Sequence, residues 1–491
     1  MLRDMLYALG ATVTAPYWVW RMLRTGKWRT DWRGRFGHVQ RAAHEVSGMQ
    51  GAAHAVSGPA KPCEAASGGD VCEGVSRERG SSGTILIHAV SVGEVNATRQ
   101  LVDKLAASVD GVVPRIVIST TTDTGFARAT ELFGRQHTVV RFPLDFTRCV
   151  RRFLDAVKPD VVALVELEVW PTFVEECDKR GIPVCVINGR LSARSFKRYK
   201  LIRSLIHSSF VKLRAVAVQT PDYAERFIAL GAAKERVSVT DSMKWDTAKV
   251  EEPAAVTGAA ELAAAMGIDL GKPLIVAGST GPGEEEMLIR TKPAGVQLLI
   301  APRKPERFEE VAKLLEQSRH REGAVASASS VLSEQPLADA RGSDKAVVRR
   351  TRHRDGNTRS IDGTEIFLLD TLGELRKAYA LADVVIVGRS FINLYGSDPI
   401  EPIALGKPTI IGPRYGDFED IVNAFRAEAG ICVSAHPCAA AVELLENHEQ
   451  ARVLAEIGRK VILARQGATD RHVKLIREML DERRCSYSPP S

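Results

Sequence analysis

Three glutamate side chains follow short apolar segments in the first half of the chain, where they would be well placed for catalysis. Glu94 follows the run TILIHAV through a turn at 91–93, and Glu166 and Glu168 follow the run at 161–165. Open parallel sheets bind ligands at the carboxyl ends of their strands, so we expect these carboxylates to face one crevice. A carboxylate in that position suits a general base, and Glu94 is our candidate. The alternative is that Glu94 only stabilises the N-terminus of the next helix.

The spacing of Glu166 and Glu168 predicts that both carboxylates lie on the same side of an extended segment. Carboxylates that converge on a crevice are costly unless they are used or paired. Arg190, Arg194 and Lys244 are the cations that we expect to pair with them. A structural ion-pair network therefore stays open as the alternative to a catalytic arrangement.

Several segments in the second half suit an anionic ligand. The loop GSTGPGE at 278–284 follows an apolar run and opens a helical pattern, so its backbone N–H groups are expected to cradle a phosphate. The segment APRKPER at 301–307 carries three cations. Asp398 and Glu401 start another helical pattern and are candidates for binding ribose hydroxyls. Helix N-terminal charge is the alternative for Glu401.

These residues need strands and helices to position them, and the sequence supplies two series of short apolar runs separated by amphipathic stretches. Such alternation predicts an α/β fold with two Rossmann-like domains that face a central cleft. The expected strands are 84–89, 115–119, 138–141, 161–164, 184–187, 215–218 and 237–240 in the first series, then 273–277, 297–301, 365–369, 384–387, 408–411 and 431–433 in the second.

The N-terminal segment predicts a membrane anchor. Residues 5–20 contain no charged side chain, include an aromatic cluster and are followed by six basic residues between 21 and 35. That pattern is typical of a segment that spans a bilayer or lies in its interface, with the rest of the protein on the cytoplasmic side. The alternative is a helix buried against the first domain. The net charge of +7 suits an anionic partner and does not by itself choose between membrane, nucleic acid and phosphorylated substrate.

Two segments differ in composition from the rest. Residues 38–83 are rich in Ala, Gly and Ser and predict a flexible linker or insertion. Residues 318–363 are polar, and their basic tract KAVVRRTRHR at 345–354 predicts a disordered loop. A nucleic-acid site is not expected there, because no aromatic side chains are interleaved with the cations. The eight cysteines show no metal-type C-x₂-C spacing, so we expect no metal site.

Eleven motifs, in order along the chain, carry a resemblance to a known family. They are HAVSVGE, STTTDTG, FPLDF, ELEVWP, NGRLSARS, SMKWD, GSTGPGEE, APRKPERF, DTLGEL, YALADVVIVG and DPIEP. In order and spacing the chain resembles the 3-deoxy-D-manno-octulosonic acid (Kdo) transferases, which are lipid A-specific inverting glycosyltransferases of lipopolysaccharide biosynthesis. The resemblance implies the GT-B fold, with a lipid A precursor (lipid IV-A) as acceptor and CMP-Kdo as the donor substrate. It implies no cofactor and no metal.

The resemblance also implies roles for particular residues. Glu94 matches the family's general base, and Glu166 and Lys244 match the pair assigned to stabilising the transition state. The positions that match the family's CMP site are Pro302, Arg303, Leu372, Gly373, Glu374, Asp398, Pro399, Ile400 and Glu401. Partners implied in the same way are the lipid A precursor and a membrane, reached through residues 5–24, at the cell inner membrane. Nucleic acid is not among the expected partners, and the oligomeric state stays open.

The chain departs from the family's motifs mostly on the donor side. Arg389 replaces the second glycine of a GGS motif, and Tyr395, Ser397 and Asp398 fall within the counterpart of a GGHNPLE motif. Elsewhere Lys304 replaces a histidine, Asp241 a glycine and Trp245 a phenylalanine. These changes keep two alternatives open: a GT-B transferase for a related nucleotide sugar, and an inactive protein that binds lipid A or nucleotide.

The expected organisation follows from the motifs and the composition. It comprises an anchor and basic flank at 1–37, an insertion at 38–83, an acceptor domain at 84–247, a linker at 248–271, a donor domain at 272–465 with an insertion at 318–363, and a C-terminal helix and tail at 466–491.

Overall fold

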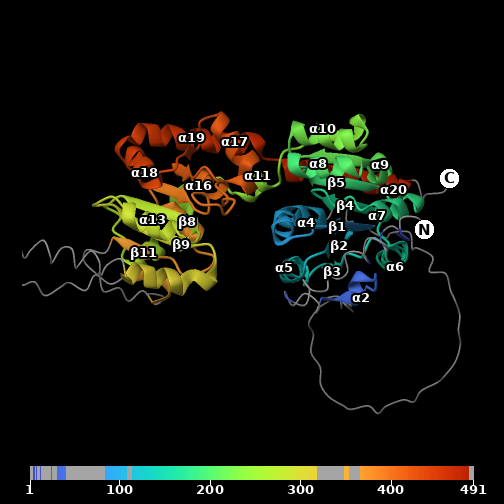
Figure 1. Cartoon of the computed structure of the whole chain (residues 1–491), viewed down its shortest axis with the longest axis horizontal. Helices are drawn as coiled ribbons and strands as arrows, with labels where there is room; N and C mark the ends of the chain where they lie inside the picture. Colours follow the sequence, from blue (N-terminus) through green and yellow to red (C-terminus); the bar gives the residue numbers. More distant parts are fainter. Residues whose placement is uncertain are drawn as a thin grey trace, which may run out of the picture. The chain divides into compact units, whose positions relative to one another are not determined.

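The computed structural model describes residues 30–39, 83–107, 113–317, 348–352 and 365–485, together with residues 4, 5, 7, 12 and 24. The chain divides into two compact units, one made of 1–243 with 467–491 and the other of 244–466. Each unit is built on a seven-stranded sheet, and helices lie between successive strands along the chain (Figure 1). The predicted fold class, α/β with two Rossmann-like domains, is confirmed.

The sheet of the first unit has the strand order β3-β2-β1-β4-β5-β6-β7, and all of its pairs are parallel. The observed strands agree with the expected ranges to within two residues at either end. Their bounds are β1 Thr84–His88, β2 Arg115–Thr120, β3 Thr138–Arg141, β4 Val161–Val165, β5 Val184–Gly189, β6 Ala215–Val218 and β7 Val237–Val239.

Both faces of this sheet are buried, which explains why its strands read as continuous apolar runs. Alternate side chains along β4 enter different cores: Val162 and Leu164 pack into one cluster, and Val161, Ala163 and Val165 pack into another. The helices of the unit are α2 Trp32–Arg35, α3 Val92–Ala97, α4 Arg99–Ala106, α5 Asp123–Phe133, α6 Thr147–Val157, α7 Pro171–Lys179, α8 Ala193–Leu201, α9 Arg203–Val211, α10 Pro221–Leu230 and α20 Ala468–Cys485.

The helix α20 closes the core of the first unit from the far end of the chain. Drawn in red in Figure 1, it packs against α4, β4 and β5. Ile476, Met479 and Leu480 are buried in the same cluster as the β1 side chains Ile85 and Ile87. The predicted C-terminal helix at 466–491 is therefore an integral part of the first unit.

The sheet of the second unit has the order β10-β11-β9-β8-β12-β13-β14 and is also parallel. Alternation again divides its side chains between two buried clusters. The strands are β8 Leu274–Thr280, β9 Gln297–Pro302, β10 Val348–Arg349, β11 Ile366–Leu368, β12 Val384–Val387, β13 Thr409–Ile411 and β14 Cys432–Val433.

The helices of the second unit lie between these strands and after them. They are α11 Lys244–Thr247, α12 Ala259–Met266, α13 Glu284–Thr291, a helix at 308–317, α15 Leu375–Leu381, α16 Ile400–Ala404, α17 Glu419–Ala427, α18 Pro437–Glu446 and α19 His448–Arg465. Short 3₁₀ turns add Lys234–Arg236 in the first unit, and Pro253–Ala255, Pro305–Arg307, Arg350–Arg352 and Gly416–Phe418 in the second.

Two expectations differ from the structure of the second unit. Residues 248–271, expected as a linker, contain α12, whose side chains Leu262 and Met266 are buried in the core. Residues 348–352, expected within a disordered loop, form the edge strand β10 and a 3₁₀ turn. The strand was missed because two residues inside a basic tract give no hydrophobic periodicity. Residues 318–347 and 353–364 lie outside the described part of the chain.

The structure tests the N-terminal predictions only in part. Most of the predicted anchor at 5–24 and nearly all of the predicted insertion at 38–83 lie outside the described residues. Of the described residues near the start, Asp4 accepts a hydrogen bond from the Thr147 N–H at 3.0 Å, and the Tyr7 hydroxyl donates to Asp145 at 2.9 Å. None of the helices that the structure describes is long and apolar enough to cross a bilayer.

Candidate functional site

Glu94 lies in the first turn of α3, directly after β1. The Ser91 hydroxyl caps this helix by accepting from the Glu94 N–H, and it donates in turn to Glu94 Oε1 at 2.8 Å. Glu94 Oε2 accepts from the backbone N–H of Val90, also at 2.8 Å. The S-x-x-E sequence thus folds as a capping box. Glu94 therefore does stabilise the N-terminus of α3, as the alternative interpretation predicted. The same hydrogen bonds also hold its carboxylate at the carboxyl end of β1.

Burial raises the pKa of the Glu94 carboxyl above its ordinary value. The hydrogen bonds from Val90 and Ser91 act in the opposite direction, and the nearby charge of Glu168 raises the pKa further. A carboxylate has room for about four hydrogen bonds, so the two donors leave capacity for a substrate hydroxyl. A raised pKa also makes the group a better proton acceptor.

Glu166 and Glu168 do not occupy an extended segment, so the expected alternation is wrong. Glu166 adopts a left-handed conformation with φ of 63°, which turns the chain directly after β4. Beyond this turn, Glu168 Oε2 accepts from Trp170 Nε1 at 2.8 Å. Burial raises the pKa of Glu168, and the charge of Glu166 contributes to the rise. The charge of Glu166 therefore acts on Glu168, and the charge of Glu168 acts on Glu94.

His88 belongs to this cluster; it opens the HAVSVGE motif but was not among the predicted site residues. Its ring is completely buried and stacks on Phe142 with the centroids 3.8 Å apart. Nδ1 lies 3.1 Å from the Ser119 carbonyl, whereas Nε2 makes no hydrogen bond and lies 3.9 Å from Glu168 Oε2. Burial lowers the pKa of His88 to about 3, so the ring is neutral and does not offset the negative charge of Glu168. The feature of the sequence that could have identified His88 is its place at the carboxyl end of an apolar strand.

Lys244 opens α11 and belongs to the second unit, whereas Glu94 and Glu166 belong to the first. Its ammonium group lies 4.9 Å from the centroid of the Phe418 ring and interacts electrostatically with Asp398. The Asp398 carboxylate accepts from the backbone N–H of Ile400 at 3.0 Å, at the start of α16. The structure therefore groups Lys244 with one of the predicted donor-site residues.

The segment at 278–284, which includes the end of β8 and the first residue of α13, differs from the expected phosphate cradle. Glu284 is completely buried, and its Oε2 accepts from the Gly281 N–H at 2.9 Å. The same side chain accepts from the N–H groups of Arg389 at 2.5 Å and Phe391 at 3.0 Å. The chain's own carboxylate thus occupies the place that an anion was expected to take, and it joins this loop to the loop after β12.

The three cations after β9 have different surroundings. Pro302 ends the strand, and Arg303 and Lys304 are exposed to solvent. Arg307 instead lies 2.6 Å from Glu285, a carboxylate that is completely buried. Arg303 and Lys304 are therefore available to an anionic ligand, and Arg307 stabilises the fold.

The other predicted donor residues lie after β11 and at the start of α16. Leu372 is 73% exposed, and Gly373 adopts a φ of 83°, which favours glycine. Glu374 is held by Arg350 at 3.0 Å. Pro399 and Ile400 start α16, and Glu401 in its first turn lies 3.7 Å from Arg376.

Three of the departures from the family's motifs fall where the backbone itself favours glycine. Asp241, Arg389 and Tyr395 have φ values of 60°, 59° and 67°. The left-handed backbone therefore persists although the glycine has been replaced. At the preceding Gly388 a Cβ atom would lie 2.6 Å from the Thr280 Cα, so that glycine is required by packing. The Arg389 guanidinium donates to the Leu394 carbonyl at 2.9 Å and thereby closes its own loop.

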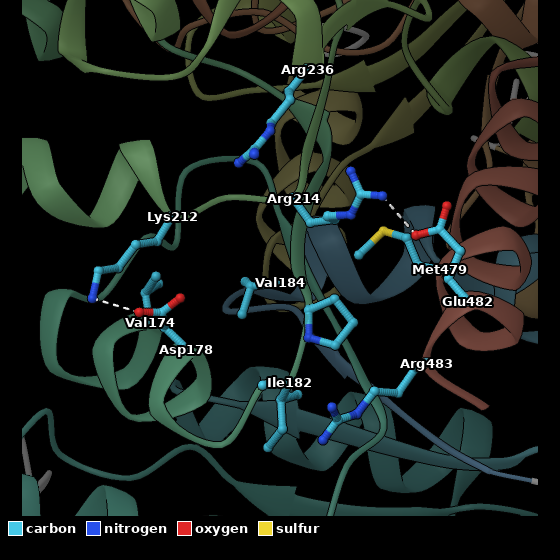
Figure 2. Close-up of a pocket in the computed structure, with 12 residues that line it drawn as sticks. Val174, Asp178, Ile182, Val184, Lys212, Arg214, Arg236, Met479, Glu482 and Arg483 are labelled. Atoms are coloured by element: carbon cyan, nitrogen blue, oxygen red, sulfur yellow. Dashed lines mark hydrogen bonds and ion pairs between the residues drawn. The ribbon is translucent and has the colours of Figure 1, made fainter. Parts of the chain in front are cut away.

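A cavity of about 340 Å³ in the first unit lies at the other end of the sheet. Figure 2 shows Ile182 and Val184, at the amino end of β5, among its lining residues. Its cations are engaged within the unit: Arg214 pairs with Glu482 at 2.8 Å, and Lys212 with Asp178 at 2.7 Å. Because ligands bind at the carboxyl ends of such strands, this cavity is not the candidate site.

Cys185 and Cys177 are buried thiols in the first unit. In the part of the chain that the structure describes, no cluster of three or more His, Cys, Asp or Glu side chains could hold a metal ion.

Comparison with known proteins identifies a family. Residues 30–247 match the family model described as 3-deoxy-D-manno-octulosonic-acid transferase. The chain is 30% identical over 414 residues to a 3-deoxy-D-manno-octulosonic acid transferase of Bordetella pertussis, covering 81% of this chain and 87% of the relative. It is 29% identical over 407 residues to the transferase of the same name from Haemophilus influenzae, with 81% and 87% covered.

Among solved structures, the UDP-GlcNAc 2-epimerase of Neisseria meningitidis bound to UDP-GlcNAc is similar with a TM-score of 0.50 and 13% identity. The similarity covers 81% of this chain and all of the epimerase chain, and it concerns the fold alone. The similarity in sequence to the transferases identifies a family, whereas the similarity in structure to the epimerase identifies only a fold. By its sequence, the chain belongs to the family of 3-deoxy-D-manno-octulosonic acid transferases.

Proposed function

We propose that this protein is an inverting glycosyltransferase that moves Kdo from CMP-Kdo to a sugar hydroxyl of a lipid A precursor. The observation that carries the proposal is the Glu94 carboxylate, fixed by two hydrogen bonds at the carboxyl end of β1 and raised in pKa. A sugar hydroxyl is a poor nucleophile and needs such a base. Family membership supports Kdo as the group transferred, and the lipid A precursor is proposed as the acceptor.

The reaction is a single displacement. Glu94 accepts the proton of the acceptor hydroxyl as its oxygen attacks the anomeric carbon of Kdo. The bond from that carbon to the phosphate oxygen of CMP breaks, and its electron pair leaves with CMP. Attack from the face opposite CMP inverts the configuration. Burial of the base and exclusion of water favour the sugar hydroxyl over hydrolysis.

Charge on the departing CMP calls for cations rather than for a general acid. Arg303 is exposed after β9 and is proposed to bind the phosphate, together with backbone groups at 372–374 and the start of α16. Lys244 and Glu166 are proposed to stabilise the transition state. Support for the role of Lys244 is its electrostatic contact with Asp398, which belongs to the proposed donor site.

We also propose that the protein works at the cytoplasmic side of the inner membrane. The acceptor is a lipid, the net charge is +7 and the charge-free segment at 5–20 precedes a basic flank. Such a flank is attracted to anionic lipid headgroups. Separation of membrane and soluble fractions, with and without residues 1–29, tests the proposal. An unchanged membrane-bound fraction after the deletion would contradict the assignment of the anchor.

The decisive experiment is a mass-spectrometric assay of the purified protein with CMP-Kdo and a tetraacylated lipid A precursor, beside Glu94→Gln. We expect product from the parent and very little from the variant, and the product mass counts the sugars added. Glu131→Gln, at an exposed glutamate on α5, is the matched control. A folded parent that binds CMP and forms no product would overturn the Kdo assignment.

The reaction is further proposed to need no metal ion or organic cofactor, because the leaving group is already activated. We expect the rate to stay unchanged after dialysis against EDTA and in the absence of added divalent cation. Loss of activity that Mg²⁺ or Mn²⁺ restores would contradict this expectation.

A further inference from the structure

The edge strand β10 brings cations from the polar insertion into the second unit. It pairs in parallel with β11, so Val348 lies opposite Phe367 and Arg349 opposite Leu368. The residues after it therefore meet the residues after β11 at the carboxyl edge of the sheet. This is the edge at which open α/β sheets bind ligands.

Arg349 and Thr351 hold the strand in place. The Arg349 guanidinium donates from Nε to Asp370 at 3.0 Å and from Nη1 to Glu309 at 3.0 Å. Thr351 donates to the same Asp370 from its backbone N–H at 2.8 Å and from its hydroxyl at 2.6 Å. Anchoring of the strand is thus accounted for without Arg350.

Arg350 instead lines a cavity of about 620 Å³ that also contains Phe308, Thr371, Leu372 and Glu374. Its guanidinium donates to both oxygens of Glu374, from Nε at 3.0 Å and from Nη2 at 3.2 Å. Both side chains are only 15% exposed. The cavity therefore combines an aromatic ring and an exposed leucine with a charged donor and acceptor fixed side by side.

The Glu374 carboxylate stays ionised and can accept from a ligand. Burial alone would raise its pKa, but hydrogen bonds from Arg350 and Thr371 lower it on balance. Thr371 Oγ1 donates at 2.6 Å, and Lys377 Nζ is the most distant donor, at 3.4 Å. The Lys377 bond is the one that an incoming N–H group would replace at least cost.

We propose that the Arg350–Glu374 pair reads the base of the nucleotide donor and selects cytosine over uracil. This inference rests on the proposed function, in which the donor is a cytidine nucleotide. Cytosine presents one amino donor beside two acceptors, so Glu374 accepts from the amino group and Arg350 donates to the ring nitrogen or carbonyl. Phe308 and Leu372 provide the apolar walls of the base site.

Uracil presents the opposite pattern at two of these three positions. Its carbonyl oxygen replaces the amino group and would face the Glu374 carboxylate, so two acceptors would meet without a proton between them. Its ring N–H would likewise face a donor of Arg350. Buried polar groups that are left without hydrogen-bond partners weaken the binding of the wrong base more than the loss of an apolar contact does.

The test compares the affinities of the full-length protein for CMP and UMP by isothermal titration calorimetry. The parent is expected to prefer CMP. In Arg350→Met the affinity for CMP falls by about tenfold or more and that for UMP changes little, so the preference largely disappears. Arg350→Lys keeps the positive charge but loses the bidentate guanidinium, and its preference for CMP over UMP lies between those of the parent and Arg350→Met. The matched control is Arg459→Met, which removes an arginine paired with Glu252 elsewhere in the second unit.

Thermal melting shows that each variant is folded before its affinities are compared. An equal loss of CMP and UMP affinity in Arg350→Met would overturn the inference, because the guanidinium would then bind phosphate or ribose. An unchanged preference in a folded Arg350→Met would overturn it as well. A parent protein that bound no CMP would instead contradict the proposed function itself, and the inference would fall with it.

Discussion

The carboxyl edges of the two sheets use acidic side chains in different ways. After the first sheet, Glu94 and Glu168 are partly buried and have raised pKa values, and the charge of Glu168 contributes to the rise at Glu94. After the second sheet, Glu284 and Glu285 are completely buried and are saturated by three backbone N–H groups or by Arg307 and Thr280. Burial raises the pKa of Glu284 as well, so the two edges differ in how many hydrogen bonds their carboxylates already accept within the protein and not in the direction of the pKa shift.

The difference shows that position in the fold does not decide what a carboxylate does. All four residues follow parallel strands, and Glu94 and Glu284 both stand in the first turn of a helix. The number and kind of hydrogen-bond donors around each oxygen separates a base from a structural group. Substitutions that remove one carboxylate at a time should therefore divide into losses of rate and losses of stability.

Glu94→Gln is expected to have the largest effect of these substitutions on the rate. Because the amide cannot accept the hydroxyl proton, we expect kcat to fall by about 10²–10⁴-fold. The free energy of unfolding should change by no more than about 1 kcal/mol, the usual worth of a helix cap. Rates are measured by single-turnover mass spectrometry and stability by urea denaturation, with Glu131→Gln as the control. A large loss of stability with a normal rate would contradict this prediction, because Glu94 would then be a structural group and not the base.

Glu285→Ala is expected to do the opposite. It leaves the Arg307 guanidinium, itself 11% exposed, without its buried partner, which costs about 3 kcal/mol or more of folding stability. Glu310→Ala removes the second and exposed partner of the same arginine and should cost less than about 1 kcal/mol. Denaturant midpoints check both values. Equal losses in the two variants would show that burial does not set the worth of this pair.

Tyr395→Gly tests whether the loops of the second edge are held against backbone strain. Glycine removes the cost of a left-handed φ at an exposed residue, and we expect a gain of about 0.5–1 kcal/mol after its greater chain entropy is subtracted. Tyr395→Ala keeps the strained backbone and should give no gain. Thermal melting measures the stability of both variants. An equal change in stability in the two would show that backbone strain at residue 395 is not the cause.

Glu168→Gln should change the pH dependence of the reaction. The negative charge of Glu168 raises the pKa of Glu94, so its removal lowers that pKa. Activity requires ionised Glu94 and is lost as the pH falls through its pKa, so the acidic limb of kcat/KM should move to lower pH. Profiles of kcat/KM against pH for parent and variant measure the shift. A limb that stayed in place or moved to higher pH would show that Glu168 does not act on the base.

Much of the fold was predictable because burial on both faces leaves a local record in the sequence. Runs such as VVALV at 161–165 and VVIV at 384–387 became β4 and β12, and the S-x-x-E pattern at Glu94 became a capping box. The edge strand β10 was not predictable, since only one of its two residues, Val348, packs in the apolar core, and the other, Arg349, is held by ion pairs with Asp370 and Glu309.

The candidate site was predictable by residue type and less so by geometry. Alternation failed at Glu166 because a left-handed turn at a non-glycine residue has no signature in the local sequence. The roles of Glu284 and His88 depend on atoms far away in the chain: the N–H groups of Arg389 and Phe391 for one, and Ser119, Phe142 and Glu168 for the other. Such contacts follow only from the folded chain.

The packing of α20 has a consequence for synthesis on the ribosome. The second unit has all of its residues once position 466 has left the exit tunnel, whereas the first unit still lacks Ile476, Met479 and Leu480 from its core. His472, which accepts from the Asn188 N–H at 3.1 Å, arrives equally late. The half that is translated first therefore cannot complete its core until the end of the chain has been synthesised, and until then the apolar surface of β4 and β5 that α20 covers stays exposed.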